Sequence, residues 1–427
     1  MKLLIKNGEV VDPANKIDAK LDVLIEDGKI REVAKGINPD GAEVIDAQGK
    51  IVAPGLIDMH AHLREPGRED EETLQTASKA AVKGGFTSVC AMPNTIPPCD
   101  NQGVAGFVSS EARQIGLCNI YVIGTVTKGR KGEELSEAGE LKDAGVIALS
   151  DDGDPVENSE IMRRALEYAT MFDLPIIAHC QDRALSKDSV MNEGFTSTLL
   201  GLRGQPSIAE STRVGRDIEI CAMTKGRLHI AHVTTRRSIE LIREAKKRNI
   251  RVTCETCPHY FSLTDEAVKT SGFDTNTKMN PPLRGRDDLD AVIEGLKDGT
   301  IDCIATDHAP HTEDEKDTDF DSAPFGIIGL ETTLAVAILE LIDKKVLNWP
   351  QLVEKMSLAP AKVLGLATKG TLSVNADADV VIIDPVRTWT VTKEALESKS
   401  KNTPFMGKTL KGAAVATIMS GTIVYRG

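Results

Sequence analysis

Residues 51–64 read Ile51-Val52-Ala53-Pro54-Gly55-Leu56-Ile57-Asp58-Met59-His60-Ala61-His62-Leu63-Arg64, an apolar run that ends in two histidines and an arginine. Side chains at positions i and i+2 of a β-strand point to the same face. His60, His62 and Arg64 therefore share one face at the end of a strand that we predict over residues 52–60. Neutral imidazole binds transition metals, and a guanidinium binds anions. By itself the pattern fits a metal site beside an anion site and two ordinary histidines in a turn equally well, so the rest of the sequence must decide.

The middle of the chain alternates between two patterns. Short β-branched runs, predicted as strands, are followed by amphipathic segments, predicted as helices. About eight such units over about 310 residues fit a (β/α)8 barrel. A doubly wound open sheet is the alternative, but its glycine fingerprint is missing after the first strand. The predicted strands cover residues 52–60, 87–92, 120–124, 146–150, 175–179, 228–232, 252–256 and 302–306, and the main predicted helices cover residues 71–83, 159–172, 207–223, 237–248 and 289–297.

The two ends of the chain differ from the middle. They consist of short alternating runs separated by turns, with Asp27-Gly28 and Ser420-Gly421 as turn signals. Because the termini of a domain often lie close together, we expect both ends to pair in one sheet. The expected fold class is α/β: a small β-rich, sandwich-like domain of residues 1–54 plus 370–427 beside a catalytic (β/α)8 barrel of residues 55–369.

Polar side chains gather where the predicted barrel strands end. Seven of the eight histidines lie at or just beyond a strand end, and His229 alone lies inside a strand. Barrels of this type build their active sites from the carboxyl ends of their strands. Chance would scatter histidines onto surface helices, so the clustering favours a metal site. In strand order, the ends carry His60 and His62, Asn94, Asp151-Asp152-Gly153, His179, His232, Cys257-Pro258-His259, and Asp307-His308 with His311.

The candidate ligands exceed what one four-coordinate metal ion accepts. The surplus predicts two divalent ions that share a carboxylate. Zinc suits a histidine-rich set with carboxylates best, and manganese, cobalt and iron stay open. The set comprises His60, His62, His179, His232, Asp307 and one of Asp151 and Asp152. Support of a ligand, substrate contact and an ordinary core position all stay open for His259, His308 and His311.

Composition restricts the function classes. The chain has 427 residues and a net charge of −13, which argues against nucleic-acid binding. No apolar run approaches the roughly 20 residues of a membrane span, and the first strand is too short for a signal peptide, so we expect a cytoplasmic protein. The eight cysteines are then reduced thiols. Cys254 and Cys257 could form half a zinc site or a redox pair, but buried small side chains are favoured because no second pair accompanies them.

Several segments resemble the dihydroorotase family of amidohydrolases and occur in the family's order. Residues 54–64 are similar to the amidohydrolase signature as dihydroorotases carry it, and Ala305-Thr306-Asp307-His308-Ala309-Pro310-His311 is similar to the second dihydroorotase signature. The resemblance covers the barrel and both ends and points to the class I bacterial type. Further matching segments are Met92-Pro93-Asn94-Thr95, Met279-Asn280-Pro281-Pro282-Leu283-Arg284 and Phe325-Gly326-Ile327-Ile328-Gly329-Leu330-Glu331.

The resemblance implies an enzyme that reversibly closes N-carbamoyl-L-aspartate to (S)-dihydroorotate with loss of water, the third step of pyrimidine synthesis. It also implies two divalent ions, and we expect a homo-oligomer, most simply a dimer. Asp307 would carry the proton. By position, His60, His62 and Asp307 would hold one metal, His179 and His232 the other, and Asp152 would bridge them; Arg64, Asn94 and Asn280 would bind the carboxylate side of the substrate, and His62, His311 and the Phe325-Gly326 backbone would also contact it.

Two other functions stay open. The first is a cyclic amidohydrolase of the hydantoinase, dihydropyrimidinase or allantoinase kind. Many hydantoinases and allantoinases bridge their metals with a carboxylated lysine that ends the fourth strand. Here that strand ends in Ala148-Leu149-Ser150-Asp151-Asp152-Gly153, so the bridging carboxylate must come from aspartate. Some relatives are inactive companions of aspartate transcarbamoylase, but such companions usually lose metal ligands that this chain retains. A complex with that enzyme in addition to activity stays open.

The segment Glu313-Asp314-Glu315-Lys316-Asp317 is strongly acidic. It could be a mobile loop near the mouth of the site or a solvated surface turn. We expect the surface turn.

Overall fold

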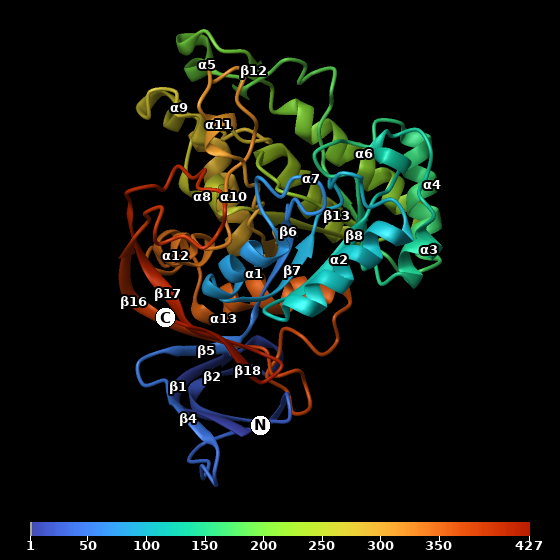
Figure 1. Ribbon diagram of the computed structural model, residues 1–427. Coiled ribbons are helices and arrows are strands. Elements are labelled where there is room, and N and C mark those ends of the chain that lie inside the picture. Colours follow the sequence, from blue (N-terminus) through green and yellow to red (C-terminus); the bar gives the residue numbers. More distant parts are fainter. Residues whose placement is uncertain (1) are drawn as a thin grey trace.

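Two large sheets organise the molecule (Figure 1). The computed structural model describes residues 2–427, and each of these sheets has eight strands. One sheet curls into a barrel that helices surround, and the other collects strands from both ends of the chain. The predicted fold class, a (β/α)8 barrel with a small β-rich domain built from both termini, is confirmed.

The barrel strands lie side by side in sequence order and pair in parallel. The barrel closes where Ala61 and His308 form a parallel bridge and the His62 amide donates to the His308 carbonyl at 2.8 Å. All carboxyl ends therefore meet at one rim. The strands are β6 (Leu56–Ala61), β7 (Phe86–Ala91), β8 (Asn119–Gly124), β9 (Ala148–Ser150), β10 (Ile176–Ala178), β13 (Leu228–Ile230), β14 (Val252–Thr256) and β15 (Cys303–Ile304).

Amphipathic helices cover the outside of the barrel (Figure 1). α7 (Arg236–Lys247) is typical: the Thr235 side chain caps its first turn, and Ile239 and Ile242 turn inward to the barrel core. The other helices are α1 (Leu74–Lys83), α2 (Gln102–Ile115), α3 (Ala138–Asp143), α4 (Ser159–Thr170), α5 (Phe195–Leu200), α6 (Ile208–Thr224), α8 (Pro258–Ser262), α9 (Glu266–Thr270), α10 (Arg286–Asp298), α11 (Glu313–Lys316), α12 (Thr333–Ala337), α13 (Trp349–Val353) and α14 (Ala359–Leu364).

A few shorter elements complete the rim and the connections. A two-stranded sheet lies between β10 and β13 in the sequence. Its strands are β11 (Met191–Asn192) and β12 (Gly204–Gln205); the short helical turns are η1 (Pro13–Asn15), η2 (Lys128–Arg130), η3 (Thr275–Thr277), η4 (Ile338–Ile342) and η5 (Glu354–Leu358).

Strands from the two chain ends share the second sheet. Both predicted turns consist of two residues with positive φ: 50° and 75° at Asp27-Gly28, and 48° and 77° at Ser420-Gly421. Tight hairpins of type I′ require this conformation at both central residues, which explains the glycines. The strands are β1 (Lys2–Asp12), β2 (Ile17–Glu26), β3 (Lys29–Ala34), β4 (Glu43–Asp46), β5 (Ile51–Pro54), β16 (Val380–Thr390), β17 (Thr409–Met419) and β18 (Thr422–Arg426).

The terminal sheet packs directly on the barrel. One continuous apolar cluster contains Phe86 of the barrel together with Val381 and Ala414 of the terminal sheet. The Thr417 hydroxyl adds a hydrogen bond of 2.6 Å to the Val82 carbonyl at the end of α1. A second cluster fills the other side of the sheet. The division of the chain between residues 54 and 55 and between residues 369 and 370 stays a prediction.

The first predicted strand is wrong in one respect. Residues 52–60 do not form one strand, because the chain passes from the terminal sheet to the barrel at Gly55. β5 pairs with β1 and β16, whereas β6 pairs with β7. A Cβ at Gly55 would lie 2.2 Å from the Thr87 hydroxyl, so the crossing requires a residue without a side chain. An unbroken apolar run in the sequence carries no signal for this change of partner.

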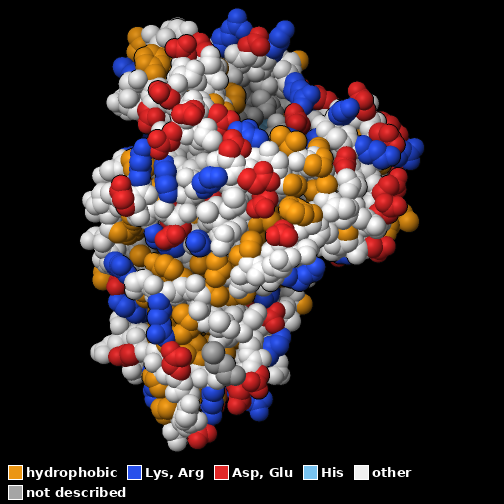
Figure 2. Space-filling model, viewed as in Figure 1, with side chains coloured by type: hydrophobic (Ala, Val, Ile, Leu, Met, Phe, Trp, Pro, Cys, Tyr) orange, Lys and Arg blue, Asp and Glu red, His pale blue; other side chains and the backbone are white. Residues whose placement is uncertain are grey.

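The cysteines and the surface charges have simple descriptions. All eight cysteines are buried and unpaired. Figure 2 shows acidic and basic side chains interspersed over the visible face. Among residues 2–427, no helix is long and apolar enough to cross a membrane.

Replacement of Gly55 by alanine tests the crossing between the sheets. We expect Gly55→Ala to lower the free energy of unfolding by about 1–3 kcal/mol, because the new methyl group overpacks the site against Thr87. Urea unfolding measures the change. Gly106→Ala in α2 is the control: nothing lies within 4 Å of the added Cβ, so alanine should raise helix stability by roughly 0.5–1 kcal/mol. Equal stabilities for Gly55→Ala and the unmodified protein would contradict the prediction.

Candidate metal centre and active site

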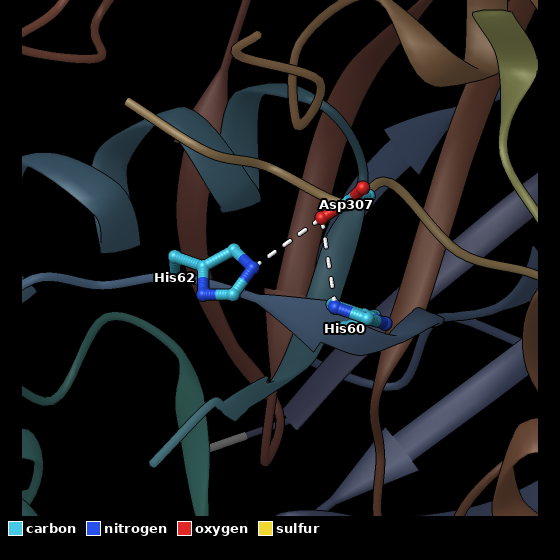
Figure 3. A group of neighbouring side chains, drawn as sticks. All are labelled: His60, His62 and Asp307. Carbon is cyan, nitrogen blue, oxygen red and sulfur yellow. Dashed lines mark ion pairs between the residues drawn. The ribbon is translucent and has the colours of Figure 1, made fainter. Parts of the chain in front are cut away.

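The first and last barrel strands bring two histidines against one aspartate (Figure 3). His60 belongs to β6, His62 follows it directly, and Asp307 lies just beyond β15. One Asp307 oxygen, Oδ1, lies 3.5 Å from His60 Nε2 and 3.4 Å from His62 Nε2. Because β6 and β15 meet at the barrel closure, residues almost 250 positions apart in the sequence share one corner of the rim.

Asp152 lies between two pairs of histidines. Its Oδ2 is 3.2 Å from His60 Nε2 and 3.4 Å from His62 Nε2. Its Oδ1 is 3.5 Å from His179 Nδ1 and 3.3 Å from His232 Nε2. Each carboxylate oxygen therefore faces a different imidazole pair. This is the geometry that a carboxylate shared by two ions requires.

The neighbouring Asp151 turns away from the histidines, as alternation along a strand predicts. Its Oδ1 accepts the amides of Val126 and Thr127 at 2.8 and 3.1 Å, and its Oδ2 accepts the Thr127 hydroxyl at 2.5 Å. These bonds satisfy Asp151 within the loop that follows β8, and they leave Asp152 as the aspartate that faces the site.

The imidazoles are oriented by partners on their outer nitrogens. His60 Nδ1 lies 2.7 Å from Glu255 Oε1, and His62 Nδ1 lies 2.8 Å from Asn94 Oδ1. His179 Nε2 lies 2.8 Å from Gln181 Oε1. Each of these oxygens accepts a hydrogen bond, so the outer nitrogen carries a proton and the inner nitrogen is the one that faces Asp152.

Such an arrangement fits a bound metal ion. His60 Nε2 is fully buried and has no hydrogen-bond partner, although carboxylates lie 3.2 and 3.5 Å away. A lone pair that faces carboxylate oxygens is repelled unless a cation lies between them. Two ligands of a tetrahedral metal with bonds of 2.0–2.1 Å are about 3.3 Å apart, which matches these separations. Two overlapping groups, His60–His62–Asp307 and His60–Asp152–His232, have the spacing to hold an ion.

Both aspartates are held in the ionised form. Burial alone would raise the pKa of Asp307, but the positive charge of His60 in its protonated form and a hydrogen bond from His62 lower it to about 2. A metal ion between these groups would supply the same positive charge. Burial likewise opposes the charge of Asp152, yet contacts with His60, His179 and His232 hold the pKa of this carboxyl well below its usual range. Ionised carboxylates are the form that binds a metal.

Three residues of the site adopt a left-handed backbone. The φ angles are 65° at Arg64, 34° at His232 and 48° at Asp307. This conformation is uncommon for residues other than glycine and persists where the surrounding structure enforces it. Here it turns the side chains of these residues at the strand ends toward the rim.

The predicted substrate residues line one cavity of about 340 Å³ above the histidine centre. Gly326 has a φ of 116°, and a Cβ there would lie 2.6 Å from the Ala309 methyl, so a side chain would collide with the wall. His60 and His232 lie below the cavity floor and do not line it. The lining comprises His62, Arg64, Asn94, Asp152, Gly153, His179, Asn280, Asp307, Ala309, His311, Pro324, Phe325 and Gly326.

The remaining histidines differ in their surroundings. His308 is structural: its Nδ1 accepts the Gly329 amide at 3.1 Å and its Nε2 lies 3.3 Å from Glu72. His259 is buried beside Cys257 and Asp307 with an unpartnered Nε2, and burial lowers its pKa to about 4.

Cys254 lies apart from this group and bonds the Thr300 carbonyl, so Cys254 and Cys257 do not act as a pair.

Two supporting residues were missed by the sequence reasoning. Glu255 lies fully buried inside β14 and joins His60 to His229, whose Nε2 is 3.2 Å from Glu255 Oε2. A glutamate inside a buried strand is a signal that could have identified it. Gln181 follows His179 by two positions, the same spacing as His60 and His62, but glutamine is too common for this spacing to be a signal.

The acidic segment lies at the surface as expected, but it is a short helix rather than a turn. Glu313–Lys316 forms the short helix α11, which a capping box between Thr312 and Glu315 begins. Glu315 Oε1 is 2.6 Å from Arg68, and the Lys316 ammonium is buried against the carbonyls of Thr275 and Pro324 at 3.2 and 2.7 Å. Glu313, Asp314 and Asp317 are exposed, whereas Glu315 and Lys316 anchor the segment through partners far away in the sequence.

The barrel and its histidine–aspartate centre together define the amidohydrolase class of proteins. A family model described as "Dihydro-orotase-like" matches residues 49–238. A dihydroorotase of Trichlorobacter lovleyi is 54% identical, with 100% of both chains covered. A dihydroorotase of Pelotomaculum thermopropionicum is 56% identical over 99% of this chain and 98% of its own. The chain belongs to the dihydroorotase family.

Solved structures with the same fold carry other names. An L-hydantoinase (dihydropyrimidinase) from Arthrobacter aurescens superposes with a TM-score of 0.89 at 26% identity, over 99% of this chain and 96% of its own. A dihydropyrimidinase from Brevibacillus agri superposes with a TM-score of 0.83 at 24% identity, over 100% of this chain and 95% of its own. At this level of identity, the second likeness shows the fold alone.

Removal of Glu255 tests the buried contact behind His60. We expect Glu255→Ala to lower the free energy of unfolding by about 3–5 kcal/mol, because it strips two buried imidazoles of their partner. The isosteric Glu255→Gln should cost less, and Glu244→Ala, an exposed glutamate on α7, should stay within about 0.5 kcal/mol. Urea unfolding at neutral pH measures all three. A Glu255→Ala protein as stable as Glu244→Ala would rule out this role.

Proposed function

We propose that the protein catalyses the reversible closure of N-carbamoyl-L-aspartate to (S)-dihydroorotate with loss of water, the third step of pyrimidine synthesis. Membership of the dihydroorotase family supports this proposal. The observation that carries it is one cavity that joins the carboxylate–imidazole centre to the cationic Arg64. A cyclic amide that bears a carboxylate needs a hydrolytic centre at one end and a positive charge at the other.

Two divalent ions form part of the proposal, with zinc as the first choice for these nitrogen and oxygen ligands. His60, His62 and Asp307 would hold one ion, His179 and His232 the other, and Asp152 would contact both. Bound there, the ions would polarise the amide carbonyl and lower the pKa of water to about 7. Glu255, Asn94 and Gln181 accept hydrogen bonds from the outer nitrogens of three of the imidazoles and so direct the inner nitrogens at the centre.

Asp307 would carry the proton. Its ionised carboxylate lines the cavity and lies against His60 and His62. In ring opening it accepts a proton from the attacking water and delivers it to the departing amide nitrogen; in ring closure it takes a proton from the ureido nitrogen. The left-handed backbone at Asp307 directs this side chain at the cavity.

The opposite wall of the cavity would bind the substrate. Arg64, Asn94 and Asn280 would hold its carboxylate side, and His311 would hold the ring together with the backbone at Phe325 and Gly326. The Asn280 amide donates to Gln181 Oε1 at 2.9 Å, which fixes its position beside His179. Gly326 keeps this wall open because a side chain there would collide with Ala309.

A hydantoinase or dihydropyrimidinase activity is the second candidate, since solved structures with those names share the fold. Asp152 supports the main proposal. It would occupy the bridging position, which many hydantoinases fill with a carboxylated lysine. The complete ligand set disfavours a non-catalytic companion. We also propose a cytoplasmic dimer, with aspartate transcarbamoylase as a further protein partner.

The main prediction is direct turnover. Purified protein with zinc should open the dihydroorotate ring, and the loss of ultraviolet absorbance of dihydroorotate measures this reaction. The protein should turn over dihydroorotate faster than hydantoin and dihydrouracil. A chelator should abolish turnover, and zinc, manganese or cobalt should restore it. Metal analysis should give two ions per chain. Absence of both bound metal and turnover would contradict the assignment as an enzyme, whereas faster turnover of hydantoin would favour the second candidate.

The aspartate at the end of β15 is tested separately. Asp307→Asn should keep the fold but lower kcat by roughly 10²–10⁴-fold, because it removes the proton carrier. Steady-state kinetics and circular dichroism measure both quantities. Asp314→Asn, an exposed aspartate on α11, is the control and should keep normal kinetics. Near-normal turnover by Asp307→Asn would remove its role in proton transfer.

A further inference from the structure

Glu71 is a buried carboxylate that joins two of the proposed substrate-binding residues. It lies in the segment between β6 and α1 and is only 1% exposed. Its Oε2 is 2.8 Å from Arg64 Nε, and its Oε1 is 2.9 Å from His311 Nδ1. Arg64 follows the first barrel strand and His311 follows the last, so one carboxylate spans the barrel closure.

These contacts determine how both side chains lie against the cavity. The Arg64 Nε–H donates its hydrogen bond to the Pro310 carbonyl at 3.1 Å, beside the ion pair with Glu71, and the His311 Nε2–H donates to the Phe325 carbonyl at 2.8 Å. The inner edge of the guanidinium is thus engaged by Glu71 and Pro310, and its terminal nitrogens extend toward His311, 3.3 Å away. Arg64 therefore lies between Glu71 and the Pro310 carbonyl, and His311 lies between Glu71 and the Phe325 carbonyl.

We propose that Glu71 is a positioning residue that determines the affinity and selectivity of this cavity for a carboxylate-bearing substrate. This inference rests on the proposed function. Glu71 does not line the cavity and acts through Arg64 and His311. By holding them in a fixed relation, it lets them bind a carboxylate without first losing their own conformational freedom. A neutral ring that lacks the carboxylate gains nothing from this arrangement.

The surrounding charges explain why a buried carboxylate is tolerated beside an anion site. Arg68 Nη2 lies 3.3 Å from Glu71 Oε1 and 2.6 Å from Glu315 Oε1, so it supplies a further positive charge. Glu71, His311 and Glu315 have the spacing of a cation site. The guanidinium groups of Arg64 and Arg68 already lie against those carboxylates, and they take the place that a metal ion would have.

The test compares Glu71→Gln with the unmodified, metal-loaded enzyme. Glutamine keeps the shape and removes the charge. We expect KM for dihydroorotate and for carbamoyl aspartate to rise about tenfold, while kcat changes less than threefold and metal content is unchanged. Inhibition should follow the same rule: orotate should bind about tenfold more weakly, whereas uracil, the same ring without the carboxylate, should bind equally well to both proteins.

Matched variants separate positioning from general charge effects. Asp70→Asn removes the adjacent exposed carboxylate, which pairs with Arg68 at 2.9 Å, and should leave KM unchanged. If Glu71→Gln fails to fold, Glu71→Asp is tested instead. Aspartate keeps the charge, but its shorter side chain moves both carboxylate oxygens away from Arg64 and His311, so KM should rise. An unchanged KM in the folded variant, or a loss confined to kcat, would overturn the inference. Absence of turnover in the unmodified enzyme would instead overturn the proposed function on which it rests.

Discussion

Closure of the barrel between its first and last strands is the constraint on which the site depends. Asp58, wholly buried in β6, accepts the Thr306 amide at 3.0 Å and the Thr306 hydroxyl at 2.6 Å. The His62 amide donates to the His308 carbonyl at 2.8 Å on the same seam. Burial raises the pKa of Asp58 to about 6, so these donors must compensate for its desolvation. The seam places the His60–His62 pair against Asp307.

The centre next to this seam depends on hydrogen bonds that point away from it. Buried imidazoles are useful ligands only when their outer nitrogen carries the proton. Glu255, Asn94 and Gln181 accept from the outer nitrogens of His60, His62 and His179, and Asp152 faces the inner nitrogens. The same principle extends to the substrate end, where Glu71 holds Arg64 and His311. Much of the proposed chemistry therefore depends on acceptors that lie outside the candidate metal ligands and the cavity lining.

Much of the fold could be predicted from the sequence because its signals are local. Alternating strand and helix patterns, repeated about eight times, identify a barrel without any long-range information. The hairpins at Asp27-Gly28 and Ser420-Gly421 carry turn chemistry that few residues satisfy. Local patterns failed at Gly55, where the apolar run continues while the strand changes sheets, and at residues 313–316, where an acidic stretch is held by Arg68.

The sequence by itself determined the ligand types and their order: paired histidines after the first strand, single histidines after the fifth and sixth, and aspartates after the fourth and eighth. Only the tertiary structure showed which of Asp151 and Asp152 faces the histidines. Adjacent residues point in opposite directions, and here Asp151 bonds Thr127 while Asp152 lies against His60. It also revealed Glu71, Glu255 and Gln181. Their roles arise from hydrogen bonds and ion pairs between residues that folding brings together, and spacing along the chain does not encode those contacts.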